Sequence, residues 1–359
     1  MEYIILIILY AGYSFVLGFL LHKYLINSTE KYNLKKANVT GIRWETQTKP
    51  IFGGITFFSL FIFGIINYVL LFKGDFLTNN IGVGIILVVT ISFLIGLADD
   101  LLNSSPFFKF FAQLACALLL INFDIYIKIF ESQTLNYLLT VFWVVGIMNS
   151  INMLDNMDAI TSSISTLIFA FFILVVIYQD YVDKWFYLIV LVSAISSTGS
   201  FLIFNWHPSK MYMGDNGSMF LGALLSIAGI LFIWNMPAQN LEHPGFTPLL
   251  IIWLLFTVPI TDTTTVSINR LLKGKSPFVG GKDHTTHYLS YLGLSDRGVA
   301  LVMIAITIIS HLLAGLLMFH IKSPTKQELI LFAIWPTLVF ITLFSITKIV
   351  KPKEKKKNA

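Results

Sequence analysis

Long apolar runs recur along nearly the whole sequence, and they restrict the possible folds more than any other feature. A run of about 17–25 apolar residues is long enough to cross the hydrocarbon core of a bilayer as a helix. We expect a spanning helix in each such run, at residues 3–26, 51–72, 80–98, 107–123, 135–151, 162–178, 185–204, 219–235, 247–268, 298–320 and 327–348. The predicted fold is therefore all-α, a polytopic integral membrane bundle of about eleven transmembrane helices.

The composition excludes an ordinary soluble protein. Only 12% of the residues are charged and 56% are hydrophobic, whereas a soluble domain carries about 25% charged residues. The first apolar run has neither a basic segment before it nor a small-residue cleavage site, so we interpret it as a helix and not as a signal peptide. Cys116 is the only cysteine, which excludes an intramolecular disulfide and a cysteine-based metal site.

The distribution of basic residues predicts the orientation. If loop 27–50 is cytoplasmic, 19 of the 24 lysines and arginines lie on the cytoplasmic side and five lie outside. Cytoplasmic loops of membrane proteins carry such an excess. We expect one membrane domain over residues 1–359, with the N-terminus outside and the basic tail 351–359 in the cytoplasm. The net charge of +5 fits this orientation better than nucleic-acid binding.

A polar break at residues 210–218 contains one carboxylate, Asp215, between Gly214 and Gly217. Glycines allow the backbone to turn sharply and to approach a ligand closely. The break is either a tight loop between two spanning helices or a metal and phosphate site. The other polar groups of the chain decide between these two interpretations.

Further polar groups stand at the ends of the apolar runs. Asp99 and Asp100 end the third run, where adjacent carboxylates are costly unless water, a cation or a base accompanies them. Lys109 follows and can return towards the pair. The alternatives are a helix-terminal charge for the carboxylates and an interfacial, snorkelling side chain for the lysine.

Two more loops carry similar groups. Asn152, Asp155 and Asp158 recur every third residue, so on a helix they share one side and favour a water- or ligand-lined surface over a solvated helix end. His284 and His287 follow a glycine pair and can grip a phosphate. They could also bind zinc, but no third strong ligand is nearby in the sequence.

These loops all lie on the predicted cytoplasmic side. Carboxylates with few histidines suit a hard cation, with Mg²⁺ preferred and Mn²⁺ as the alternative. Lysines and histidines beside such an ion suit a phosphorylated substrate, so the pattern indicates phosphoryl transfer at a membrane surface. The sequence contains no Walker A motif and no kinase motif set.

At these residues the sequence resembles the polyprenyl-phosphate N-acetylhexosamine-1-phosphate transferases, a superfamily that includes the phospho-N-acetylmuramoyl-pentapeptide transferases. The resemblance extends from Lys49 to about Arg297. Its motifs, in order, are Pro50-Ile-Phe-Gly-Gly54, Gly96-Leu-Ala-Asp-Asp100, Asn152-Met-Leu-Asp-Asn-Met-Asp158, Lys210-Met-Tyr-Met-Gly-Asp-Asn-Gly-Ser218 and the His284/His287 loop.

The resemblance implies a reaction in which a UDP-N-acetylhexosamine donates its sugar 1-phosphate to a polyprenyl phosphate, with UMP as the second product. Undecaprenyl phosphate in a bacterial inner membrane is the expected acceptor, and initiation of a cell-envelope polysaccharide is the expected purpose. Direct attack by the lipid phosphate is preferred over a covalent carboxylate intermediate. The resemblance also leaves a homodimer open, and it implies no nucleic-acid partner.

The resemblance assigns roles residue by residue. Asp215 matches the principal magnesium ligand and Asn152 the second. Asp99 and Asp100 match an acidic pair near the lipid phosphate, and Lys109 matches a lysine on the reacting phosphates; these three are the predicted catalytic residues. The predicted substrate-binding residues are Lys49, Asn103, Asp155, Asp158, Lys210, His284 and His287.

The chain departs from the family pattern at three positions. Asn156 and Ala159 stand where glycines are usual, and Thr286 stands where a middle histidine is usual. The run of three histidines of the muramoyl-pentapeptide branch is absent, which favours a simple UDP-sugar over the peptide-bearing substrate. An ion-coupled transporter would place its carboxylates near the bilayer midplane, and an idle scaffold would not need all five aspartates.

Overall fold

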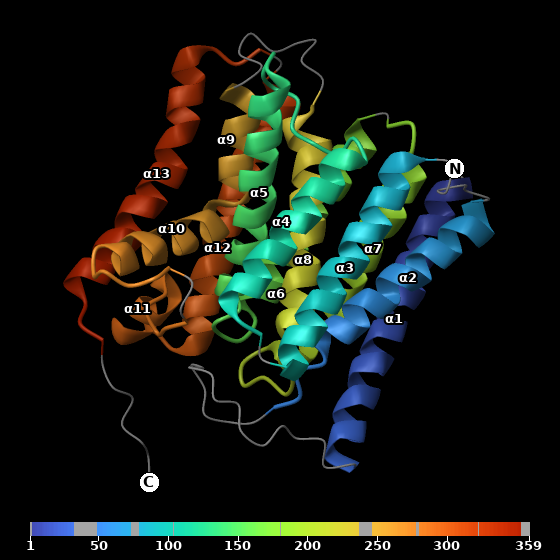
Figure 1. The fold of residues 1–359 in the computed structure, drawn as a ribbon, viewed down its shortest axis with the longest axis horizontal. Coiled ribbons are helices and arrows are strands. Elements are labelled where there is room, and N and C mark those ends of the chain that lie inside the picture. Colours follow the sequence, from blue (N-terminus) through green and yellow to red (C-terminus); the bar gives the residue numbers. More distant parts are fainter. Residues whose placement is uncertain are drawn as a thin grey trace.

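The structure is a computed structural model that describes residues 2–31, 49–72, 79–102, 104–179, 181–236, 246–277, 280–321 and 323–352. Within these residues it contains thirteen α-helices, two short π-helical turns and no β-strand, which confirms the predicted all-α fold (Figure 1). The helices are α1 (Glu2–Lys31), α2 (Gly53–Phe72), α3 (Asn80–Leu102), α4 (Pro106–Asn122), α5 (Gln133–Leu154), α6 (Ile160–Tyr178), α7 (Lys184–Asn205), α8 (Asp215–Gly229), α9 (Phe246–Leu255), α10 (Thr257–Leu271), α11 (Thr285–Tyr291), α12 (Asp296–Gly315) and α13 (Lys326–Ile349).

Most of these helices can cross a bilayer. In the described part of the chain, nine are long and apolar enough, and the pair α9 and α10 would make a tenth if counted as one broken span. The predicted run 107–123 forms α4, which is apolar but has 17 residues. The chain is therefore a multi-pass membrane protein, as predicted.

One predicted span is not continuous. Residues 247–268 were expected to form a single helix, but α9 ends at Leu255 and α10 leaves it at an angle of 84°. Pro259 lies in the first turn of α10, where proline is tolerated at a helix start but would break a helix interior. Asp262 and Arg270 also make α10 unsuited to hydrocarbon. The continuous span was therefore wrong, and α10 lies across the bundle in Figure 1.

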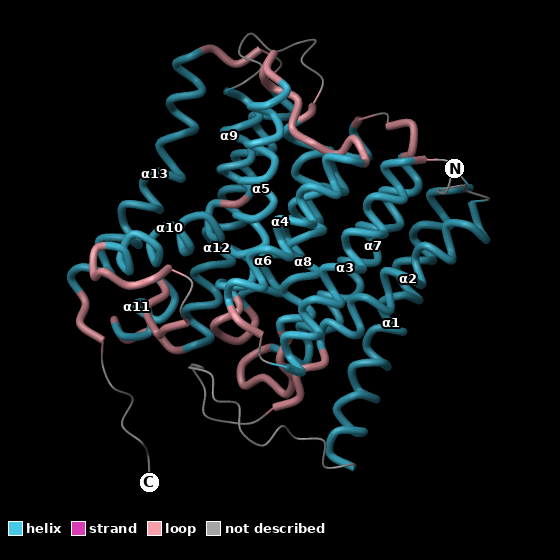
Figure 2. Tube along the Cα trace, viewed as in Figure 1, coloured by secondary structure: helices cyan, strands magenta, loops and turns pink. Residues whose placement is uncertain are grey.

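Helix α8 is the centre of the bundle. Of the 18-residue apolar window in its span, 94% is buried, against 17% in α1 and 22% in α13. It packs chiefly against α3, α5 and α2. The loops after α3, α5 and α7 lie at one end of the bundle, the lower end in Figure 2. The polar motifs of three separate loops therefore meet around the start of the most enclosed helix.

Candidate active site

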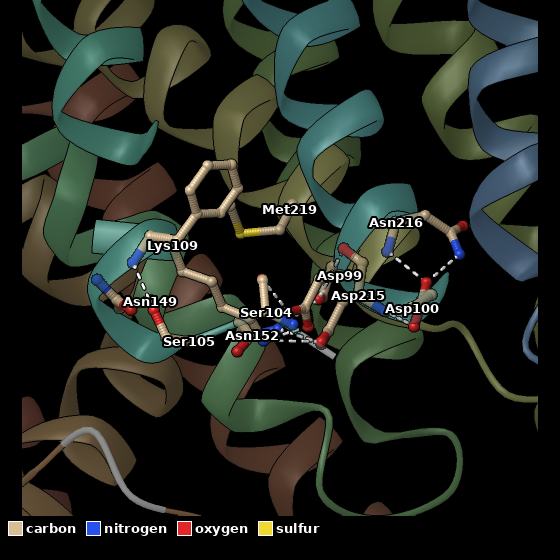
Figure 3. A network of polar contacts seen from close by, with 12 residues as sticks. Asp99, Asp100, Ser104, Ser105, Lys109, Asn149, Asn152, Asp215, Asn216 and Met219 are labelled. Carbon is tan, nitrogen blue, oxygen red and sulfur yellow. Dashed lines mark hydrogen bonds and ion pairs between the residues drawn. The ribbon is translucent and has the colours of Figure 1, made fainter. Parts of the chain in front are cut away.

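Three charged side chains from three helices meet at that end of the bundle (Figure 3). The Nζ of Lys109 in α4 lies 2.5 Å from Oδ2 of Asp99 in α3 and 2.8 Å from Oδ2 of Asp215 in α8. The side chains of Lys109 and Asp215 are 25% and 31% exposed, so a ligand can reach both. The lysine is oriented by two carboxylates and carries the positive charge that a phosphate would need.

Asp99 is fixed on its other side by Ser104. The backbone N–H of Ser104 donates to Asp99 Oδ1 over 2.9 Å, and the serine hydroxyl donates to the same oxygen. Sequence reasoning missed Ser104, although its place between the acidic pair and Pro106 is typical of a polar helix start. Asn103, a predicted substrate-binding residue, lies outside the described residues.

Asp100 faces in a different direction from Asp99. Its Oδ1 accepts the backbone N–H of Asp215 at 3.0 Å, and its Oδ2 accepts the backbone N–H of Asn216 at 2.9 Å and the Asn216 side-chain amide (Figure 3). The first N–H groups of a helix have no partner within it, and negative charge is favourable there. Asp100 thus caps α8 from another helix. These contacts favour a supporting role, and its catalytic role stays a prediction.

Glycines allow the backbones around α8 to approach so closely. Gly54 donates its N–H to the carbonyl of Met213 at 3.1 Å, and a side chain at Gly54 would overlap Asn216 and Gly217. A side chain at Gly96 of α3 would overlap the backbone of Asp215. Gly214, the residue before α8, has a φ of +79°. The glycine motifs of three loops therefore serve one purpose, the close packing of the start of α8.

Asn152 connects α5 to the same carboxylate. Its Nδ2 donates to Asp215 Oδ1 and to Ser218 Oγ, both at 2.8 Å. The predicted metal ligands Asp215 and Asn152 are therefore adjacent. Asp215 Oδ1 and the side-chain oxygen of Asn152 are the two atoms that would hold a cation, in place of the hydrogen bond that the Asn152 amide donates to Asp215.

This donor set fits Mg²⁺, which takes one or two carboxylates and completes its shell with water and substrate phosphates. Among the described residues, no three or more His, Cys, Asp or Glu side chains form a group that could hold a metal ion. A metal at Asp215 would therefore depend on ligands that a substrate supplies.

The remaining loop residues form a second cluster. Asp158 is buried and accepts the backbone N–H of Ser209 at 3.0 Å and its hydroxyl at 2.7 Å, while His207 Nδ1 lies 3.2 Å away. Lys49 Nζ donates to Ser209 Oγ at 3.0 Å. Asp158 and Lys49, both predicted to bind substrate, thus join the loops before α6 and α8 with the segment before α2.

Two further predicted substrate-binding residues are exposed. Asp155 follows α5 directly, and the side chain of Lys210 is also exposed. Ala159, at the start of α6, has a φ of +65°, the left-handed conformation that favours glycine. This conformation accounts for the glycine that is usual at this position in the family pattern.

The histidine loop is anchored by a carboxylate that sequence reasoning missed. Asp262 of α10 is 1% exposed; its Oδ2 lies 2.7 Å from Nδ1 of His284, and its Oδ1 accepts the N–H and hydroxyl of Thr285. The signal was present in the sequence, because an acidic residue inside an apolar run is rarely passive. An unbroken span over residues 247–268 gives Asp262 no such role.

Two other contacts fix the histidine loop. Arg270 binds Asp283 through two hydrogen bonds of 2.9 and 2.7 Å. Burial alone would raise the pKa of Asp283, but these contacts with Arg270 hold it below its usual range. Thr286 donates to Asn156 Oδ1 at 2.6 Å. Two of the three departures from the family pattern therefore contact each other.

Comparison with known proteins supports the resemblance. Residues 82–233 match the model of glycosyl transferase family 4. A probable undecaprenyl-phosphate N-acetylglucosaminyl 1-phosphate transferase of Bacillus subtilis (strain 168) is 29% identical over 316 residues, which is 85% of this chain and 82% of the relative. The matched region includes α3, α4, α5 and the start of α8, which supply Asp99, Lys109, Asn152 and Asp215.

Two other relatives have names that refer to related substrates. A decaprenyl-phosphate N-acetylglucosaminephosphotransferase of Mycobacterium leprae (strain TN) is 29% identical over 58% of this chain and 58% of the relative. A phospho-N-acetylmuramoyl-pentapeptide-transferase of Streptococcus pneumoniae (strain CGSP14) is 25% identical over 74% of this chain and 83% of the relative. The five motifs, the family match at residues 82–233 and these relatives agree that the chain is similar to the polyprenyl-phosphate hexosamine-1-phosphate transferases.

Proposed function

We propose that this protein transfers an N-acetylhexosamine 1-phosphate from a UDP-sugar to undecaprenyl phosphate and releases UMP. The observation that carries the proposal is the position of Lys109 between Asp99 and Asp215 at an open end of the bundle. The relationship to transferases that act on undecaprenyl and decaprenyl phosphate supports it. The product would initiate a cell-envelope polysaccharide.

The reaction needs one bond to form and one to break. An oxygen of the lipid phosphate attacks the phosphorus that carries the sugar, and the bond from that phosphorus to the oxygen of the uridine phosphate breaks. The electron pair leaves with UMP, so phosphate charge is conserved and no net proton is taken up. Such a transfer depends mainly on positioning and on neutralising negative charge.

The residues of the site can supply both. Lys109 Nζ donates hydrogen bonds to phosphate oxygens, while Asp99 and Asp215 set its position. Asp215 and Asn152 would hold Mg²⁺, which would neutralise charge on the substrate phosphates. Asp100 and the glycines around α8 keep Asp215 in place. The lipid phosphate is the attacking group, so Asp99 need not become covalently bound.

The positive-inside bias supports a site at the cytoplasmic face of a bacterial inner membrane. A UDP-sugar would then reach the site from water, and the lipid phosphate would reach it from the bilayer. The muramoyl-pentapeptide relative makes the peptide-bearing donor the second candidate. The His-Thr-Thr-His sequence at residues 284–287 favours the simple UDP-sugar.

The test is UMP release by the purified protein in detergent with undecaprenyl phosphate and Mg²⁺. The panel of donors contains several UDP-N-acetylhexosamines and UDP-N-acetylmuramoyl-pentapeptide, each with and without a chelator. The expected result is release from one simple UDP-sugar that requires lipid and is lost with the chelator. Release from the pentapeptide donor alone would establish the second candidate, and no release by folded protein from any donor would contradict the proposal.

A further inference from the structure

The two histidines of the loop have different surroundings. His284 has its Nδ1 2.7 Å from Asp262 Oδ2. His287 accepts the backbone N–H of His284 on its Nδ1 at 3.4 Å. His287 therefore holds the loop together, whereas His284 is held by a carboxylate through one ring nitrogen.

Asp262 determines which nitrogen of the His284 ring carries the proton. An ionised carboxylate can only accept hydrogen bonds, so the atom facing Asp262 Oδ2 must be a protonated Nδ1. The other oxygen, Oδ1, is occupied by the N–H of Thr285 at 2.8 Å and its hydroxyl at 2.6 Å. The carboxylate therefore cannot rotate away without losing two bonds. The nitrogen that His284 can offer to a ligand is Nε2.

The contacts of α5 place this arrangement beside the active site. Ser150 Oγ accepts the hydroxyl of Thr263 in α10 at 2.9 Å. Asn152, two residues later, contacts Asp215, and Asn156 contacts Thr286 in α11. One seven-residue stretch thus contacts the helix that carries Asp262, the carboxylate at the reacting phosphates and the loop that carries His284.

We propose that Asp262 is a positioning residue for the donor substrate: it holds His284 with Nδ1 protonated, so that Nε2 contacts the nucleotide sugar. This proposal rests on the proposed function. Asp262 lies almost completely buried and acts through His284 without contacting substrate itself. Arg270 does not share this role, because its hydrogen bonds go to Asp283 and to the carbonyl of Pro277.

The variant Asp262→Asn separates positioning from folding. The amide oxygen can keep both bonds from Thr285, but the amide nitrogen then faces His284 and must donate to Nδ1. The ring proton is then forced onto Nε2. This nitrogen would donate a hydrogen bond to the substrate, whereas in the wild type it accepts one. We expect kcat/KM for the UDP-sugar to fall by about 10–100-fold, the effect typical of partners that orient ligating histidines. The melting temperature should stay close to that of the wild type.

Thr285→Val is the matched control. It removes one hydrogen bond to the same carboxylate but leaves the contact with His284, so kcat/KM should stay within about twofold of wild type while the melting temperature falls. His284→Gln should lose activity to the same degree as Asp262→Asn. The double variant should be no worse than either, because both changes remove one interaction. Equal losses in Asp262→Asn and Thr285→Val, or losses that multiply in the double variant, would overturn the proposal.

A second readout does not depend on activity. With ¹⁵N-labelled histidine, the His284 signals, identified by their absence in His284→Gln, should show a protonated Nδ1 in the wild type and a protonated Nε2 in Asp262→Asn. A wild-type ring with its proton on Nε2 alone would refute the positioning role. If the wild type shows a protonated Nδ1 on His284 but releases no UMP, the result would count against the proposed function and not against the positioning role.

Discussion

Asp100 and Asp262 each cap the start of a neighbouring helix, and the surroundings of the two carboxylates differ. Asp100 holds the start of α8, a helix enclosed by α2, α3 and α5 with glycine contacts on two sides. Asp262 holds the start of α11, which has seven residues and is not one of the spanning helices. Asn156 also contacts α11. The first arrangement fixes reacting groups within the core. The second fixes a peripheral loop, so its loss should affect substrate binding more than folding.

The largest expected effect concerns the reacting groups themselves. Lys109→Met removes the cation between Asp99 and Asp215, and loss of one such preorganised group costs about 10²–10³-fold in kcat. The side chain is 25% exposed, so the protein should remain folded. Lys128→Met is the control, because Lys128 pairs with Asp124 on an exposed surface and should leave kcat unchanged. UMP release measures both, and equal rates in the two variants would remove Lys109 from the reaction.

A smaller effect, on the free energy of unfolding, compares the helix caps Asp100 and Asp262 directly. Asp100→Ala leaves the N–H groups of Asp215 and Asn216 without their acceptor and should destabilise the protein by about 2–3 kcal/mol. Asp262→Ala leaves one backbone N–H, that of Thr285, without its acceptor. The Thr285 hydroxyl and the His284 ring also lose theirs, but these side chains can turn towards other partners, so we expect a cost of about 1–2 kcal/mol. Thermal unfolding in detergent compares them. A larger loss for Asp262→Ala would reverse the contrast between core and periphery.

The histidine loop should also make stability depend on pH. Burial first, and then the nearby His284, lowers the pKa of His287 to about 3, against about 6.5 in an unfolded chain. Below pH 6.5 the unfolded state therefore binds a proton that the folded state does not. Stability is fully present above that pH and should fall by about 2 kcal/mol between pH 7 and pH 5.

The pH dependence can be assigned to His287 with a variant that cannot be protonated. His287→Asn should unfold with a shallower dependence on pH between 7 and 5 than the wild type. The Asp283 carboxylate does not interfere, because its lowered pKa in the folded state and the ordinary aspartate pKa of about 3.9 in the unfolded chain both lie below this range. The same slope in variant and wild type would show that His287 is not the group that titrates.

The smallest effect tests the contact between Asn156 and Thr286. Asn156→Ala and Thr286→Val each remove the same hydrogen bond of 2.6 Å. In a double-mutant cycle we expect a coupling of about 0.5–1.5 kcal/mol in kcat/KM for the UDP-sugar. Additive losses would mean that these two departures from the family pattern occurred independently and do not act together.

The sequence predicted most of the architecture because hydrophobic runs directly report the length of a spanning helix. It also predicted which loops hold the polar groups, and Asp99, Lys109, Asn152 and Asp215 do lie together. It could not show that Asp99 and Asp100 face different partners, because adjacent residues at a helix end point in different directions. That difference depends on how α3 packs against α8.

The break between α9 and α10 was harder to predict. Residues 247–268 have enough apolar side chains to read as one span, and Pro259 alone can sit within a kinked helix. The polar residues Asp262 and Arg270 were the better signal, because each needs a buried partner. Their partners, His284 and Asp283, come from a loop whose position the sequence does not reveal.

The most direct test of the account follows the two phosphates of the donor separately. UDP-sugar labelled with ³²P at the phosphate next to the sugar, or at the phosphate next to uridine, is incubated with the purified protein and undecaprenyl phosphate. The first label should move into the lipid extract and the second should remain in water as UMP, and Lys109→Met should abolish both changes. A first label that stays in water as sugar 1-phosphate would show hydrolysis, and would contradict transfer to the lipid.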